Sequence, residues 1–247
     1  MTGLEILPAI GLGIVRPLFV LAPLPLAGTK PLPVALQALL ALALAYYLMP
    51  RMGPVPTLDP LATVVIVAGE ALTGFAIGLS VSLAIHAARM AGELIGTSMG
   101  IGFASMVDPA NGNPVPAVGQ FLALTAVALF MALDGPVLLV RLVADSYATV
   151  PFGTGFRVES VPALTRGMGT MFASALGLAL PVVAATLIVQ VALAAMARLA
   201  PQLNLFAVGF PATLIVGLLV FALAFSAMGS AMVGSWRTTI HAAANLT

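Results

Sequence analysis

The chain has 247 residues, of which 61% are hydrophobic and only 7% carry a charged side chain. A soluble domain is typically about 45–50% apolar and about 25% charged, so this chain has too few polar residues to cover a water-soluble surface. The net charge of +1 gives no electrostatic basis for binding nucleic acid, and the absence of cysteine excludes disulfides and cysteine-ligated metals. The composition therefore indicates an integral membrane protein.

The apolar runs predict an all-α polytopic membrane protein, organised as one helical domain over residues 1–247. A helix needs about 20 apolar residues to cross a bilayer, and several runs reach that length. Connections rich in proline and glycine separate them, whereas the alternating pattern of barrel strands is absent over any useful length. In chain order, we expect helices near residues 6–27, 33–50, 61–90, 115–142, 168–197 and 205–235.

The last two apolar runs are longer than one crossing requires. Pro181, Pro201 and Pro211 interrupt them, and helices usually end or kink near proline, so we expect breaks there. With six crossings, five lysine and arginine residues would lie on the N-terminal side and three on the opposite side, which is a weak bias for orientation. Both features favour a subunit that packs inside a protein assembly as helical hairpins.

Glycine spacing indicates close helix packing on one predicted helix and the segment that follows it. Gly92, Gly96 and Gly100 recur every four residues and share one helix face, and Gly74 and Gly78 repeat the pattern upstream. Small residues at this spacing let two backbones approach each other in lipid. The sequence leaves open whether the contact lies within this chain or with a different subunit.

Arg16, Glu70 and Asp134 are ionisable residues inside predicted apolar helices. Such residues are costly in a membrane, and they usually pair with one another or serve a function. Glu70 lies near the middle of its helix. We favour a pair between Arg16 and Glu70 over a proton relay, because too few other ionisable groups converge. Arg89 and Glu93, one helical turn apart, are a second candidate pair.

The sequence carries no catalytic or metal-binding signature that we recognise. It has no His-Glu-x-x-His motif, no P-loop lysine and no nucleophile elbow. Its two histidines, His86 and His241, have no second ligand at a useful spacing for a metal ion. We therefore expect a protein that is not an enzyme and that binds no cofactor or metal.

The most distinctive stretch, residues 91–118, begins as a helix and then loosens at Gly100 and Gly102. Non-helical backbone at membrane depth is tolerated where protein surrounds it or where it lines a cavity. The residues alone are compatible with an ordinary re-entrant connector or with a hydrophobic plug that closes a pore. The apolar bulk and the acidic-proline pair of this stretch are Phe103, Met106, Val107, Asp108 and Pro109.

Two long motifs resemble the FliR family of export-gate subunits. They are AGELIGTSMGIGFASMVDP at residues 91–109 and RLAPQLNLFAVGFPATLIVG at residues 198–217. Two shorter segments, SYATVPFG at 146–153 and LALPVV at 178–183, are similar to family motifs in the same order. The residues that carry the second long motif are Pro201, Gln202, Asn204, Phe206, Gly209 and Pro211.

The resemblance implies a subunit of the flagellar type III export gate in the bacterial inner membrane, at the flagellar basal body. It implies FliP-type and FliQ-type partners, FlhB-type and FlhA-type components nearby, and exported flagellar proteins in transit. In the family, the loop that matches residues 99–116 closes the central channel. The resemblance thus assigns a plug role to Met99, Gly100, Ile101, Gly102, Phe103, Ala104, Ser105, Met106, Val107 and Asp108.

Alternatives remain at this point. The virulence branch of type III secretion shares much with the flagellar branch, which is favoured by Pro-Gln-Leu-Asn-Leu-Phe and Gly-Phe-Pro within residues 201–211. A small secondary transporter or channel is another alternative, for which Glu70 would supply a polar midplane site. An intramembrane enzyme would need a catalytic pair that we do not find.

Overall fold

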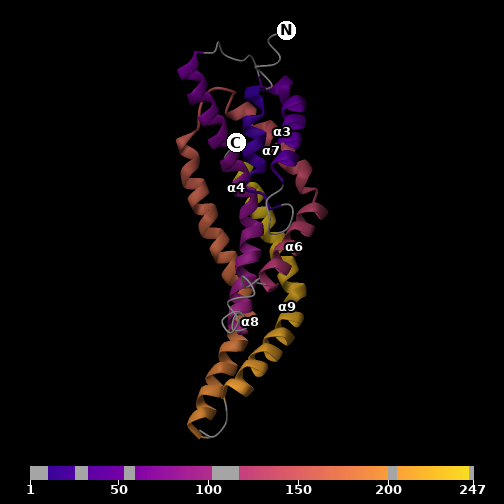
Figure 1. The fold of residues 1–247 in the computed structure, drawn as a ribbon, viewed down its shortest axis with the longest axis vertical. Helices are drawn as coiled ribbons and strands as arrows, with labels where there is room; N and C mark the ends of the chain where they lie inside the picture. The colour runs from indigo at the N-terminus through magenta and orange to yellow at the C-terminus, as the bar shows by residue number, and fades with distance from the viewer. Residues whose placement is uncertain (1–10, 26–32, 53–58, 102–116, 200–204, 245–247) are drawn as a thin grey trace. The chain divides into compact units, whose positions relative to one another are not determined.

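The computed structural model describes residues 11–25, 33–52, 59–101, 117–199 and 205–244 of the chain (Figure 1). All regular secondary structure in these ranges is helical, which confirms the predicted all-α fold. The elements are α2 (Val15–Leu21), α3 (Val34–Leu48), the short 3-10 helix η1 (Met49–Arg51), α4 (Pro60–Ser98), α6 (Ala117–Ala132), α7 (Gly135–Thr149), the 3-10 helix η2 (Val158–Ser160), α8 (Val161–Leu199) and α9 (Leu205–Ala244).

Long apolar helices dominate the part of the chain that the structure describes. By length and composition, 4 of them can cross a membrane, or up to 5 if α6 and α7 together form one broken span. The segment Gly11–Leu21, within the predicted helix at 6–27, is a shorter apolar helix. The protein is therefore a polytopic membrane protein, as its composition predicts.

The single helix predicted at 115–142 is wrong, because α6 and α7 are bent by 70° relative to each other. Asp134 makes the bend with a left-handed φ of 55°, a conformation that aspartate adopts more readily than most residues. Its carbonyl accepts hydrogen bonds of 3.0 Å from the N–H groups of Val137 and Leu138. Asp134 thus starts α7, with an exposed side chain, and does not lie inside an apolar helix.

The predicted helix breaks at Pro181 and Pro211 are also wrong. Pro181 lies inside α8 and Pro211 lies inside α9. Proline removes one backbone donor, but a helix of 39 or 40 residues loses only a small part of its hydrogen bonding in this way. Membrane helices tolerate proline where neighbouring groups compensate for the lost bond. Pro201 lies outside the described residues.

The chain divides into two compact units that alternate along the sequence. The helices α4, α6, α8 and α9 each contribute residues to both, so the division follows no linker. A single domain over residues 1–247 therefore stays a prediction. The first unit is Met1–Ala84, Val127–Thr170 and Trp236–Thr247, and the second is Ile85–Ala126 and Met171–Ser235.

Two glycines of α4 let α2 approach closely in the first unit. A Cβ atom added to Gly74 would overlap the carbonyl oxygen of Arg16, and one added to Gly78 would overlap the carbonyl oxygen of Val20. On its other sides, α2 packs against α3 and contacts α7. The four-residue glycine spacing upstream therefore serves a contact within this chain.

The second glycine series has mixed roles in the second unit. A Cβ atom on Gly92 would lie 2.5 Å from the Cα of Gly119 in α6, so these two helices touch through their backbones. One on Gly96 would make only an ordinary contact of 3.9 Å with Val118. Gly100 follows the end of α4 with a φ of 80°, which is a glycine conformation.

We predict that Gly74→Ala destabilises the chain by about 1–3 kcal/mol, because the new methyl group has only rigid backbone to displace. Thermal unfolding of the detergent-solubilised chain would measure the loss. Gly229→Ala in α9 is the matched control, since a Cβ atom there meets nothing within 4 Å. We expect the control to be neutral or to stabilise by up to about 1 kcal/mol through helix propensity. Equal melting temperatures for the two variants would contradict the close approach.

Candidate functional site

Arg16 of α2 and Glu70 of α4 form a buried ion pair in the first unit, the pairing that the sequence favoured. The Nε group of Arg16 donates to Glu70 Oε2 at 2.8 Å, and Nη2 donates to Oε1 at 3.0 Å. The two side chains are only 1% and 3% exposed. Two parallel, charge-assisted hydrogen bonds fix the geometry of both groups more firmly than a single contact does.

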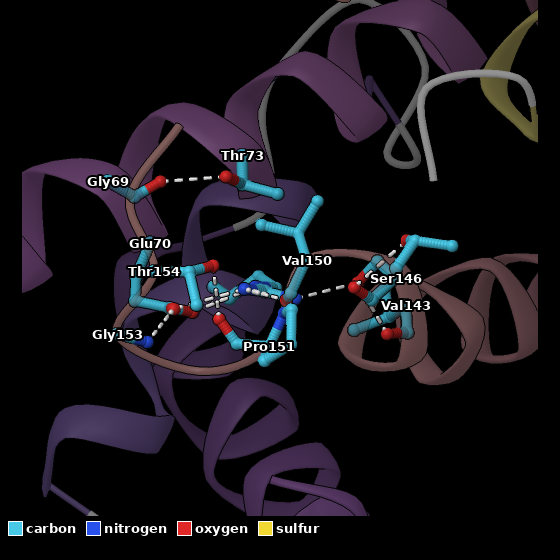
Figure 2. Close-up of polar contacts among 11 residues, drawn as sticks. Gly69, Glu70, Thr73, Val143, Ser146, Val150, Pro151, Gly153 and Thr154 are labelled. Carbon is cyan, nitrogen blue, oxygen red and sulfur yellow. Dashed lines mark hydrogen bonds and ion pairs between the residues drawn. The ribbon is translucent and has the colours of Figure 1, made fainter. Parts of the chain in front are cut away.

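The end of α7 and the loop after it supply further partners for both charges. Arg16 Nη1 donates to the hydroxyl oxygen of Ser146 at 3.0 Å, and Nη2 also donates to the carbonyl of Val150 at 3.0 Å. On the acidic side, the N–H of Gly153 donates to Glu70 Oε1 at 3.2 Å. Figure 2 labels Glu70, Ser146, Val150 and Gly153 and marks their hydrogen bonds by dashed lines.

The loop geometry explains why these groups point at the pair. Ser146 donates its own proton to the carbonyl of Val143 at 2.6 Å, which leaves its oxygen free to accept from arginine. Gly153 has a φ of 83°, a left-handed conformation that favours glycine. Thr154 closes the turn with a 2.8 Å hydrogen bond from its hydroxyl to the carbonyl of Pro151 (Figure 2).

A second glycine contact holds this loop against α4. A Cβ atom on Gly69, the residue before Glu70, would lie 2.7 Å from the Cα of Gly155. Any larger residue at 69 would push the loop, and with it Gly153, away from the carboxylate. The loop therefore reaches Glu70 because α4 presents a glycine next to it.

Tyr147 completes the surroundings of the guanidinium group. The Cζ atom of Arg16 lies 4.0 Å from the centre of the Tyr147 ring, a distance at which the aromatic face attracts a cation. The Tyr147 hydroxyl is buried and has no hydrogen-bond partner among the described residues. Tyr147 therefore contributes to the pair through its ring rather than through its hydroxyl group.

The arrangement is structural rather than reactive. Both oxygens of Glu70 accept hydrogen bonds, and four of the five N–H groups of Arg16 have acceptors among the described residues, so the groups of the pair are largely bonded within the chain. In the described ranges, no three histidine, aspartate or glutamate side chains gather as a metal site would require. The site thus joins α2, α4, α7 and the following loop.

Sequence reasoning missed the link between this pair and residues 146–153. A guanidinium group has five N–H donors, and buried donors in proteins are almost always bonded, so one carboxylate could not satisfy Arg16. That imbalance was the available signal for a second set of partners. Ser146 and Gly153 were visible in the short motif, whereas the Val150 carbonyl has no sequence signature.

Arg89 and Glu93 form the second candidate pair, but in a different setting. Their side chains lie 3.1 Å apart within α4 and are 38% and 44% exposed. An exposed pair of this kind contributes little to stability. The pair lies in the second unit, beside the contact between α4 and α6. There the Glu93 side chain lies next to Gly119 of α6.

The segment assigned a plug role is described only at its start. Met99 is fully buried, Gly100 has a left-handed φ of 80°, and Ile101 is the last described residue before residues 102–116. Of the second motif, Gly209 and Pro211 lie in α9, and Phe206 lies in its first turn. The residues of both motifs that lie outside the described ranges are Gly102, Phe103, Ala104, Ser105, Met106, Val107, Asp108, Pro201, Gln202 and Asn204.

Comparison with known proteins gives matches along nearly the whole chain. Residues 7–239 match the family described as bacterial export proteins, family 1. The flagellar biosynthetic protein FliR of Pectobacterium carotovorum subsp. carotovorum is 38% identical over 191 residues, covering 77% of this chain and 72% of the relative. FliR of Escherichia coli K12 is 32% identical, with 85% and 81% covered, and FliR of Bacillus subtilis 168 is 27% identical, with 98% and 96% covered.

We predict that Glu70→Gln destabilises the chain by about 3–5 kcal/mol, because it leaves the Arg16 charge buried without its counter-ion. The double variant Arg16→Met with Glu70→Met should be more stable than Glu70→Gln alone, since it removes both charges. A double-mutant cycle on thermal unfolding, completed with the single variants Arg16→Met and Glu70→Met, would measure the coupling.

Glu93→Gln is the matched control for Glu70→Gln. It removes the same charge from the same helix, but from a half-exposed pair, and should cost at most about 1 kcal/mol. If the two substitutions had equal effects, or if the charge-free double variant were the least stable of all, the buried pair would not organise the first unit.

Proposed function

Because the chain belongs to family 1 of the bacterial export proteins, we propose that it forms part of the channel of a flagellar export gate. It is a membrane component of flagellar protein export, in line with relatives named as flagellar biosynthetic proteins. The match over residues 7–239 carries this proposal, because it includes both long motifs and almost every helix. Unfolded flagellar proteins would pass through the channel.

The proposed role is that of a conduit rather than an enzyme. The buried charges of the first unit bond one another, and they hold α2 and the loop after α7 on α4. The energy for export would come from other components of the system. Gating would be steric and hydrophobic, since a narrow apolar constriction excludes water and ions.

The plug of this channel would be residues 99–108. Their apolar side chains suit a seal, and methionine is unbranched and adapts its shape to its neighbours. At the start of the segment, Gly100 follows the end of α4 with a left-handed φ of 80°. A short apolar segment that leaves a helix end at a defined point is a suitable element for closing a pore.

Other subunits of the export apparatus would cover much of the apolar surface. In the second unit, Ile188 of α8 is 71% exposed and Leu223 of α9 is 77% exposed. Family membership indicates association with other export components. We propose FliP-type and FliQ-type subunits as direct partners, FlhB-type and FlhA-type components as neighbours, and the inner membrane at the basal body as the location.

The transporter alternative depended on Glu70 as a free midplane carboxylate. Glu70 instead accepts two hydrogen bonds from Arg16 and one from Gly153. A substrate or proton site there would first have to break a bidentate buried pair. The geometry of the first unit therefore favours the conduit.

We predict that replacing residues 101–107 by glycine and serine, at unchanged length, makes resting cells leak ions. The replacement removes the apolar bulk of the plug but keeps the connection between α4 and α6. Potassium efflux and membrane potential in cells that assemble the gate would measure the leak. Asn111→Ser with Asn113→Ser is the control, because these polar residues have no assigned role in the seal. Unchanged ion permeability in the replacement variant would rule out the plug.

We predict that the tagged chain, solubilised in mild detergent, co-purifies with two other small helical membrane proteins of the FliP and FliQ types. The reason is the large apolar area that the chain leaves exposed on α8 and α9. Mass spectrometry of the purified material would identify the partners. A stable solitary monomer with affinity for a small substrate would instead favour the transporter.

A further inference from the structure

The end of α4 is a sharply terminated helix in the second unit. Helix ends leave their last four carbonyl groups without partners inside the helix. At α4, the N–H of Gly100 donates to the carbonyl of Thr97 at 3.0 Å, and the N–H of Ile101 donates to that of Gly96 at 3.0 Å. With the left-handed φ of Gly100, these two bonds form a Schellman motif.

The Schellman motif leaves the carbonyls of Ser98 and Met99 without a backbone partner. Side chains of two other helices donate to these carbonyls. The Nε2 group of Gln190 in α8 donates to the carbonyl of Ser98 at 3.1 Å. The hydroxyl group of Thr213 in α9 lies 3.4 Å from the carbonyl of Met99. Both of the remaining carbonyls thus have a donor from outside the helix.

The two donors differ in strength. The Thr213 hydroxyl has one proton, and it also lies 3.1 Å and 3.0 Å from the carbonyls of Gly209 and Phe210 in its own helix. Its proton is therefore shared, and the longer bond to Met99 is the weaker of the two. Gln190 supplies the shorter contact, 3.1 Å against 3.4 Å, from an exposed polar side chain within an otherwise apolar stretch of α8.

The packing of apolar side chains also holds the end of α4 against α8 and α9. The Met99 side chain is fully buried, and a Cβ atom on Gly217 of α9 would lie 2.5 Å from Met99 Cγ and 3.1 Å from Thr186 Cγ2. The missing side chain at 217 therefore provides the space that Met99 occupies. The hydrogen bonds to the carbonyls of Ser98 and Met99 and the packing of the Met99 side chain therefore hold the same end of α4.

We propose that Gln190 and Thr213 are positioning residues that cap the last free carbonyls of α4 and fix the point at which the plug segment leaves the helix. The proposal rests on the proposed function of residues 99–108. Where lipid or another subunit covers this end of α4, a carbonyl that loses its donor is costly, which favours the helix end docked on α8 and α9. The end of α4, up to Ile101, is thereby held on α8 and α9.

A single spin label tests the docking directly. The chain contains no cysteine, so Ile101→Cys creates the single attachment site of this chain, and the parent complex without it gives the background from other subunits. The full-length chain would be purified from membranes in mild detergent, with the subunits that it retains. In Gln190→Met and Thr213→Val we expect a larger mobile component in the nitroxide spectrum. The population of chains in which the end of α4 has left α8 and α9 should rise roughly fivefold when a whole hydrogen bond is lost. The rise should be smaller in Thr213→Val, because that bond is longer.

Thr186→Val is the matched control. It also removes a buried hydroxyl beside Met99, but that hydroxyl donates to the carbonyl of Val183 in its own helix at 2.9 Å. We expect its label spectrum to equal that of the parent. Equal mobility in all three variants, at equal yields of folded chain, would overturn the capping role.

The ion permeability of resting cells separates this proposal from the plug itself. If the label loosens in Gln190→Met while the glycine-serine replacement of residues 101–107 causes no leak, the capping stands and the plug function fails. If that replacement leaks and Gln190→Met leaves the label unchanged, the plug stands and the capping fails.

Discussion

The first unit depends on how an arginine is kept inside an apolar structure. Only 7% of the residues are charged, and Arg16 lies where water cannot reach it. A lone buried charge would be unstable, so the fold must bring it a counter-ion and enough acceptors. Glu70 supplies the counter-ion, and Ser146 and Val150 supply further acceptors. This requirement fixes α2, α4 and the end of α7 relative to one another within the unit.

Backbone packing and charge pairing are coupled in this arrangement. The carbonyl of Arg16 lies against Gly74, and the side chain of the same residue bonds Glu70 one turn earlier in α4. Gly69 leaves space on α4 for the loop that carries Gly153, whose N–H group donates to Glu70. The pair reaches its bidentate geometry because glycines let two segments, α2 and the loop after α7, approach α4 closely.

Much of the fold could be predicted from the sequence, because hydropathy alone marks long membrane helices. The pairing of Arg16 with Glu70 was also predictable, since few other charges were available to either. The bend at Asp134 was not, because an apolar run continues on both sides of it. The Val150 carbonyl and the caps at Ser98 and Met99 are backbone groups, and residue types carry no information about them.

The order of synthesis gives the arginine site a further consequence. Arg16 leaves the ribosome 54 residues before Glu70 and 130 residues before Ser146. At bacterial rates of chain elongation, the second interval lasts on the order of ten seconds. Through that time α2 carries a charge that lipid disfavours. Arg16 therefore gains its full set of partners only once residues 146–150 have been made, so the arginine site closes well after α2 has been synthesised.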